Sequence, residues 1–260
     1  MTSAVEVDHV RQAVPDLNEE RRMLRRRACR LVAGMDEVGR GAWAGPLVVG
    51  VVVVDASTGS LPEGVKDSKL LSATARSSLE PAISEWCAAW ALGEASPDEI
   101  DEFGLSWALS AAAWRALDAL SVRPDVVLVD GCVDIVHRHP RANGIERPTH
   151  EGGVPPAGPE VRAIIKGDRT AGSIAAASVL AKVGRDRQMT ALADDLPLYG
   201  FERHKGYGTA DHEAALVTEG LSKHHRRSWA FARRLCPGDP TLLDLSLDAE
   251  LELTARAHDR

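Results

Sequence analysis

The sequence predicts an α/β fold, in which strands and helices alternate around a central sheet. Two segments, 31–37 and 46–54, read as strands close together near the start of the chain, and the second is the richer in β-branched residues. Two further apolar runs, 123–131 and 161–168, each reach an acidic residue near their carboxyl end, which is typical of buried strands that open on a cleft. Segments with helical spacing of apolar residues separate these runs, and this alternation favours the α/β class.

The first elements are placed by their end signals. Asp16, with Glu19 three positions later, has the pattern of a capping box and predicts an N-terminal helix. The strands at 31–37 and 46–54 follow. The connection 39–45 between them contains three glycines and predicts a tight turn that a phosphate can approach.

The middle of the chain alternates between helix and strand. The segment 72–86 predicts a helix that Pro81 breaks or kinks. A strand is predicted within 87–96. The segment 96–120 then predicts one continuous helix, because Pro97 suits the first helical position and apolar residues recur at helical spacing.

The second half contains one long loop and one long helix. The segment 132–160 is rich in Pro, Gly and His and has no periodicity, so it is either a functional or a disordered loop. The segment 173–196 predicts a helix whose small first residues allow a close approach to the sheet. A basic, glycine-hinged loop (203–212), a further segment (224–235) and a loosely held acidic tail (237–260) follow.

Composition limits the possible functions. The 260-residue chain has 44% hydrophobic residues and a formal net charge of -7, which exclude a wholly disordered chain and one that coats nucleic acid through bulk charge. No signal region or membrane-length apolar stretch occurs, so we expect a cytoplasmic protein without a membrane partner. The four cysteines lack paired spacing, which favours buried reduced thiols over zinc ligands or disulfides. Basic clusters at 21–30 and 223–227 fit solvated helix faces as well as nucleic-acid patches.

Acidic residues end three of the predicted strands: Asp36 with Glu37, Asp130, and Asp168. If these strands are neighbours, four carboxylates converge at one edge of the sheet, where their repulsion calls for divalent cations. Oxygen ligands select Mg²⁺ or Mn²⁺, and two such ions are the usual machinery for attack of water on a phosphodiester. Taken one at a time, each acid fits an ordinary strand-end or turn residue equally well.

Six short motifs occur in a fixed order along the chain: GMDEVGRG, DSKLLS, VLVDG, IIKGD, SIAAASVLAKVGRDRQM and HKGYGT. In order and approximate spacing they resemble the motifs of bacterial ribonuclease HII, the type 2 ribonuclease H. The resemblance runs from about residue 31 to residue 234. It implies a ribonuclease H-like α/β fold with a mixed central sheet flanked by helices and a small C-terminal helical region.

The resemblance also implies a division of the chain. The parts are an N-terminal helical extension (1–30), a catalytic domain (31–196), a helical region that completes the substrate groove (197–236) and the acidic tail (237–260). The loop 132–160 is longer than is usual in the family.

Site residues are implied position by position. The catalytic and metal-binding acids of the family, which would hold two Mn²⁺ or Mg²⁺ ions in the substrate complex, match Asp36, Glu37, Asp130 and Asp168. The turn that reads the 2′-hydroxyl of a ribonucleotide, mostly through backbone groups, matches Gly39, Arg40 and Gly41. The tyrosine that stacks on the next sugar and favours deoxyribose there matches Tyr207. Other positions near the substrate match Lys69, Ser178, Lys182 and Lys205.

Two neighbouring pairs are given no catalytic role. Arg185 and Asp186 are interpreted as a structural ion pair on the helix. His224 and His225 are interpreted as exposed residues of a basic segment, because a metal ion can activate water without them.

The implied enzyme hydrolyses the RNA strand of RNA/DNA hybrids and incises duplex DNA 5′ to embedded ribonucleotides. It would leave 5′-phosphate and 3′-hydroxyl ends, act as a monomer and serve ribonucleotide removal from DNA. Its partners would be these nucleic acids.

Three alternatives remain open from the sequence. Ribonuclease HIII has similar chemistry but carries an N-terminal substrate-binding domain, for which about thirty residues are too few. A metal-dependent exonuclease would use the same acids but depend on free ends. A catalytically silent nucleic-acid-binding protein would bind through Arg40, Lys205 and the HHRR segment (224–227) with salt-sensitive affinity.

Overall fold

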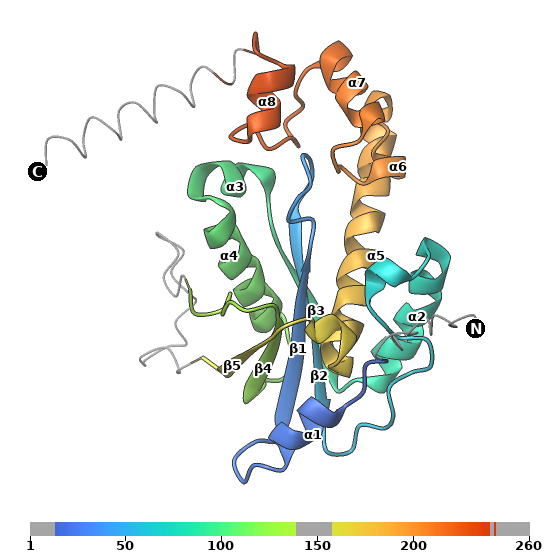
Figure 1. The fold of residues 1–260 in the computed structure, drawn as a ribbon, viewed down its shortest axis with the longest axis vertical. Coiled ribbons are helices and arrows are strands. Elements are labelled where there is room, and N and C mark those ends of the chain that lie inside the picture. The colour runs from blue at the N-terminus through green and yellow to red at the C-terminus, as the bar shows by residue number, and fades with distance from the viewer. Residues whose placement is uncertain (1–13, 139–157, 240–241, 243–260) are drawn as a thin grey trace, which may run out of the picture.

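The computed structural model describes residues 14–138, 158–239 and 242, and contains a five-stranded mixed sheet (Figure 1). The strands are β1 (Leu31–Val38), β2 (Leu47–Asp55), β3 (Ala89–Ala95), β4 (Val126–Asp130) and β5 (Glu160–Ile164). Their spatial order is β3-β2-β1-β4-β5. The pairs β1–β2 and β2–β3 are antiparallel, and β1–β4 and β4–β5 are parallel. The predicted α/β fold with a mixed central sheet is therefore confirmed.

Helices cover both faces of the sheet, with α4 on one side and α2 and α5 on the other (Figure 1). The α-helices are α1 (Asn18–Leu24), α2 (Ala73–Trp86), α3 (Pro97–Phe103), α4 (Leu105–Asp118), α5 (Gly172–Asp195), α6 (Phe201–His204), α7 (Ala210–Glu219) and α8 (Ala230–Leu235). Three short 3₁₀ helices complete the described elements: η1 (Ser68–Leu70), η2 (Gly167–Arg169) and η3 (Pro197–Tyr199).

The core has a layer on each face of the sheet. Alternate residues of β2, Val51 and Val53, pack towards α4, whereas Val52 packs towards α5. The alanines in the first turns of α5 are fully buried. They bring α5 so close to β1 that a Cβ added to Gly34 would lie 2.2 Å from the backbone nitrogen of Ile174. The predicted close approach of this helix is confirmed.

Two helix predictions need correction. The segment 96–120 is not one helix, because Gly104 adopts a positive φ of 81° and separates α3 from α4. The predicted start is right, since Ser96 and Glu99 form a capping box ahead of Pro97. Pro81 does not break α2, which is continuous. Pro81 is exposed, so the carbonyl group that loses its helical partner can be hydrated.

The N-terminal helix is joined to α5 through a buried acid. Glu20 is fully buried, and its Oε1 accepts hydrogen bonds from the Ser173 N–H (2.7 Å) and Oγ–H (2.6 Å) at the start of α5. The predicted capping box at Asp16 is wrong, because the helix begins at Asn18 and Asp16 instead accepts from the backbone and side chain of that residue. Glu20 of α1 thus caps the start of α5, the longest helix among the described residues.

Strand β5 and the thiols also differ from expectation. β5 is an edge strand and is mostly exposed, not buried. Cys29 and Cys236 are buried free thiols as predicted, but Cys132 is exposed because it lies in the connection after β4. No helix within the described ranges is long and apolar enough to cross a membrane. Most of the predicted loop and of the acidic tail lies outside the described residues.

Candidate active site

Two of the predicted acids lie side by side at the carboxyl ends of parallel strands. Met35 of β1 is in register with Val129 of β4, so the next residues, Asp36 and Asp130, are neighbours. Asp36 is only 4% exposed, and its Oδ1 accepts a hydrogen bond from the Glu37 N–H (2.9 Å). The predicted meeting of these two strand ends is confirmed.

Asp168 reaches the same edge from a different kind of element. It does not end a strand, because β5 stops at Ile164 and Asp168 lies in η2 after Lys166, whose φ is 56°. The Gly167 N–H donates to Asp130 Oδ1 (2.7 Å), which ties this 3₁₀ turn to the end of β4. Asp168 is buried, and its Oδ2 lies 3.9 Å from Lys69 Nζ.

The electrostatics of this edge disfavour ionised acids. Burial, together with the charges of Glu37 and Asp130, raises the pKa of Asp36 to about 7. Burial and the charge of Asp130 also raise the pKa of Asp168. Burial favours the neutral form of Lys69, but the surrounding aspartates outweigh this and raise its pKa. The edge therefore carries an excess of negative charge that a bound cation would relieve.

Sequence reasoning missed one further acid at this edge. Asp67 is 1% exposed, and its Oδ1 accepts from the Lys69 N–H (3.0 Å) at the start of η1. Among the residues that the structure describes, its Oδ2 has no hydrogen-bond partner, and it lies 3.4 Å from Arg169 Nε. Its place at the head of the DSKLLS motif was the available signal, but this stretch reads as an ordinary polar turn.

The donor set fits a hard divalent cation in its chemistry, since these acids offer only oxygen ligands. Across residues 14–138, 158–239 and 242, no group of three or more His, Cys, Asp or Glu side chains is arranged to hold a metal ion. The acids thus gather at one end of the sheet without forming a closed ligand cage.

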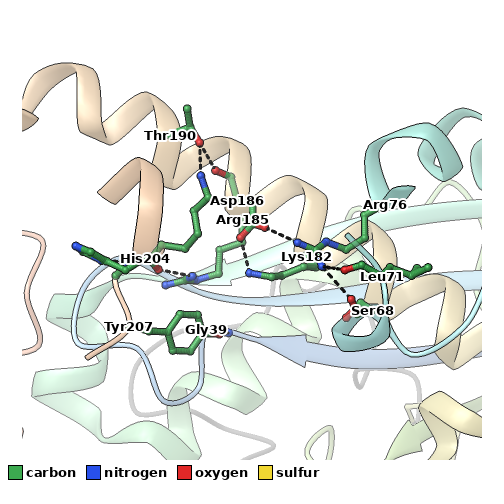
Figure 2. A network of polar contacts seen from close by, with 12 residues as sticks. Gly39, Ser68, Leu71, Arg76, Lys182, Arg185, Asp186, Thr190, His204 and Tyr207 are labelled. Atoms are coloured by element: carbon green, nitrogen blue, oxygen red, sulfur yellow. Dashed lines mark hydrogen bonds and ion pairs between the residues drawn. The ribbon is translucent and has the colours of Figure 1, made fainter. Parts of the chain in front are cut away.

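The turn after β1 is joined to the loop that carries Tyr207. The Gly39 N–H donates to the Tyr207 hydroxyl oxygen (3.2 Å; Figure 2). The backbone N–H groups of Trp43 and Ala44 both donate to the Gly206 carbonyl oxygen, at 2.8 and 3.1 Å. Arg40 and Gly41 lie at the exposed tip of the turn. Gly39, Arg40, Gly41 and Tyr207 are therefore brought together, as the sequence predicts.

The predicted substrate lysines lie beside this turn with different partners. Lys182 Nζ bonds Asp186 Oδ1 (2.6 Å) and lies 5.7 Å from the centre of the Tyr207 ring. Lys205 Nζ donates to Thr190 Oγ1 (2.6 Å). Ser178 is buried and shares a 2.7 Å hydrogen bond with Ser68 Oγ.

The predicted Arg185–Asp186 ion pair is wrong. Asp186 pairs with Lys182 and with Arg76 (3.2 Å; Figure 2). Arg185 is instead fully buried and binds backbone carbonyl groups. Adjacent residues on a helix point about 100° apart, so they seldom share partners.

The interpretation of His225 as exposed is also wrong. His225 and His212 are both fully buried, and their Nε2 atoms lie 3.0 Å apart. The Tyr207 carbonyl oxygen must accept from His212 Nδ1–H (3.0 Å), so His212 Nε2 accepts from His225 Nε2–H. His225 Nδ1 then accepts from Ser222. Both rings are neutral, and each has a fixed tautomer.

Acidification is expected to destabilise this region. Burial lowers the pKa of His212 to about 4 and of His225 to about 3, below their ordinary value of 6.5. As pH falls below 6.5, both histidines take up protons in the unfolded chain but stay neutral in the folded chain. The free energy of unfolding therefore declines until the pH reaches their pKa values in the folded state. Each histidine costs about 2 kcal/mol at pH 5. Urea unfolding at pH 7.5 and pH 5 measures this loss, and His225→Gln should reduce it; an equal loss in the variant would contradict the assignment.

Comparison with known proteins identifies the family. A family model described as Ribonuclease HII matches residues 33–232. The chain belongs to the ribonuclease HII family. It is 44% identical over 220 residues to ribonuclease HII of Streptomyces griseus, covering 84% of each chain. It is 46% identical over 207 residues to ribonuclease HII of Nitrosococcus oceani, covering 78% of this chain and 90% of that one.

The fold agrees with the assignment to ribonuclease HII. The crystal structure of the ribonuclease H2 from Pyrococcus horikoshii superposes with a TM-score of 0.60 at 28% identity, covering 79% of this chain and 96% of that chain. The chain is therefore a hydrolase, an endonuclease of the ribonuclease H type, and its family depends on divalent metal ions. The match to ribonuclease HII decides against two of the alternatives, a ribonuclease HIII and a catalytically silent binding protein.

Proposed function

We propose that this ribonuclease HII incises duplex DNA on the 5′ side of an embedded ribonucleotide and hydrolyses the RNA strand of RNA/DNA hybrids. The products would carry 5′-phosphate and 3′-hydroxyl ends. The observation that carries this proposal is the hydrogen bond from Gly39 N–H to the Tyr207 hydroxyl, three residues from the acid Asp36. This hydrogen bond supports the proposal, because it joins the turn and the tyrosine that would read two successive sugars, beside the acids that would carry out cleavage.

The acids at the sheet edge would hold two divalent ions, Mg²⁺ or Mn²⁺. Such ions supply the activation of water and the neutralisation of charge on the phosphate. The residues that would hold them are Asp36, Glu37, Asp130 and Asp168. Lys69, mostly exposed beside Asp168, would meet the substrate backbone from the open side.

The remaining residues would bind and orient the substrate. The exposed tip at Arg40 and Gly41 would approach the ribose, and Tyr207 would pack on the following deoxyribose. Lys182 and Lys205 would face backbone phosphates. Ser178 would act indirectly, because it is buried and its hydrogen bond to Asp36 lowers the pKa of that acid against the effect of burial.

The cellular setting follows from the substrate. We propose a cytoplasmic, monomeric enzyme of ribonucleotide removal, with nucleic acid as its partner. Residues 31–196 would form the catalytic domain, flanked by the extension 1–30 and the tail 237–260. The helical region 197–236 would complete the groove, since its loop already binds the turn after β1.

A closed circular substrate tests this function sharply. Supercoiled duplex DNA with one internal ribonucleotide, incubated with Mg²⁺ or Mn²⁺, is expected to relax by a single nick 5′ to the ribonucleotide, whereas an all-DNA circle stays supercoiled. A circle has no free ends, so relaxation would also exclude an exonuclease. An intact ribonucleotide circle, beside cleavage of a longer RNA/DNA hybrid, would overturn recognition of single ribonucleotides.

A further inference from the structure

The turn between β1 and β2 is held from beneath by two buried arginines. Arg226 Nη2 donates to the carbonyl oxygens of Gly39 (2.7 Å) and Gly45 (3.2 Å), and its Nη1 donates to that of Arg40 (3.0 Å). Arg185 donates to the carbonyl oxygens of Ala44 (3.0 Å), Pro46 (2.8 Å) and Lys205 (2.9 Å). Both arginine side chains are fully buried. Five carbonyl groups between residues 39 and 46 thus point at guanidinium groups.

The contacts of Arg226 fix the direction of two peptide planes. In a trans peptide the C=O of one residue and the N–H of the next point in opposite directions, and the described chain has no cis bond. Because the carbonyl groups of Gly39 and Arg40 point at Arg226, the N–H groups of Arg40 and Gly41 point away from it. Both residues are exposed, and within the described part of the chain neither N–H has a protein acceptor. Two successive amide donors therefore face outward, an arrangement that binds oxygen atoms.

Burying a neutral hydrogen-bond donor beneath this turn would cost less free energy than burying a guanidinium group. A buried charge is costly unless it is paired. The contacts of the Arg226 guanidinium, as far as the chain is described, are three carbonyl oxygens and the Trp229 ring at 4.9 Å, and its Nε has no hydrogen-bond partner. Burial and Arg185 lower its pKa only to about 10, so it is charged at neutral pH. A cation behind these peptide groups polarises them and strengthens their outward N–H donors.

We propose that Arg226 is the positioning residue that sets ribonucleotide specificity. By binding the Gly39 and Arg40 carbonyl groups it turns the N–H groups of Arg40 and Gly41 towards the 2′-oxygen of the ribose. This inference rests on the proposed function, in which the turn reads that hydroxyl. Arg226 lies beyond the motifs of the sequence, in a segment that reads as a basic surface cluster.

The test compares two substrates that differ in one substituent, the 2′-hydroxyl group or a fluorine atom. Duplex DNA carries either one ribonucleotide or one 2′-fluoro nucleotide at the same position, and kcat/KM is measured on both. Arg226→Lys keeps the charge but loses the planar fork of donors, and Arg226→Gln keeps two donors without the charge. The ratio of the two kcat/KM values is expected to fall about 10- to 100-fold in Arg226→Lys, through the rate on the ribonucleotide. The ratio of the two kcat/KM values should also fall in Arg226→Gln.

A purely structural role predicts a different pattern. Both rates would then fall together and the ratio would stay at the wild-type value, which would overturn the proposal. The ratio is measured on the same folded molecules, so a loss of folded protein cancels. Arg234→Gln is the matched control, because Arg234 is an exposed arginine of α8 paired with Glu213 (3.2 Å), and it should leave the ratio unchanged. If wild-type protein does not incise at the ribonucleotide, the proposed function fails before the variants are compared.

Discussion

Replacing Asp36 with asparagine is expected to lower the rate of phosphodiester cleavage by about a thousandfold or more. Asparagine has the same shape, and its oxygen can still accept from the Glu37 N–H, but it cannot hold a divalent cation as a carboxylate does. Asp130→Asn should behave in the same way, with the hydrogen bond from Gly167 retained. Both variants should fold, because each removes a charge from a crowded acidic edge. The measurements are nicking of the ribonucleotide duplex and thermal unfolding.

The matched control for these variants lies at the opposite end of the sheet. Asp125, immediately before β4, accepts hydrogen bonds from the backbone N–H groups of Arg30 and Leu31. Asp125→Asn should leave cleavage near the wild-type rate. Full activity in Asp36→Asn or Asp130→Asn would contradict the assignment of the sheet edge as the catalytic centre.

Gly34→Ala is expected to lower the stability of the folded chain strongly. A Cβ at this position would lie 2.2 Å from the backbone of Ser173 and Ile174, so either β1 or α5 must move. Overpacking against backbone of this kind costs roughly 3 kcal/mol or more. For a chain of this length that lowers the thermal midpoint by about 6 to 12 °C.

A second glycine serves as the control for this substitution. At Gly59 an added Cβ would meet nothing within 4 Å, so Gly59→Ala should leave the thermal midpoint nearly unchanged. Equal midpoints for Gly34→Ala and the wild type would show that the contact between β1 and α5 is looser than the structure indicates.

The positions of the strands, and of the acids at the ends of β1 and β4, were easier to predict from the sequence than the residues that contact those acids. Asp36 and Asp130 could be paired because apolar runs ending in acids are a local pattern, and parallel strands bring such ends together. Asp168 was placed on a strand end, since a one-turn 3₁₀ helix has no periodicity to detect. Asp67 escaped notice because its burial depends on η1 packing against distant elements.

The errors in the helical regions have a common physical cause. Arg185 and Asp186 are neighbours in the sequence, which suggests an ion pair. Arg185 instead binds backbone carbonyl groups of other segments, and Asp186 pairs with Lys182 one turn earlier and with Arg76 of α2. His225 lies in a basic run that resembles a solvated surface, yet its side chain is fully buried against His212. Composition describes the local chain, whereas several of these partners, such as Pro46 for Arg185 and Arg76 for Asp186, belong to segments far away in sequence.

The contact between Glu20 and Ser173 also constrains the order in which the chain can fold during synthesis. The two residues are 153 positions apart, so the first helix leaves the ribosome long before its partner exists. Until α5 has been made, α1 can pack only on the early strands β1 and β2, and the backbone N–H from which Glu20 accepts a hydrogen bond has not been formed. The hydrogen bonds of Glu20 can therefore form only after α5 has been synthesised, and their formation marks completion of the layer that includes α5.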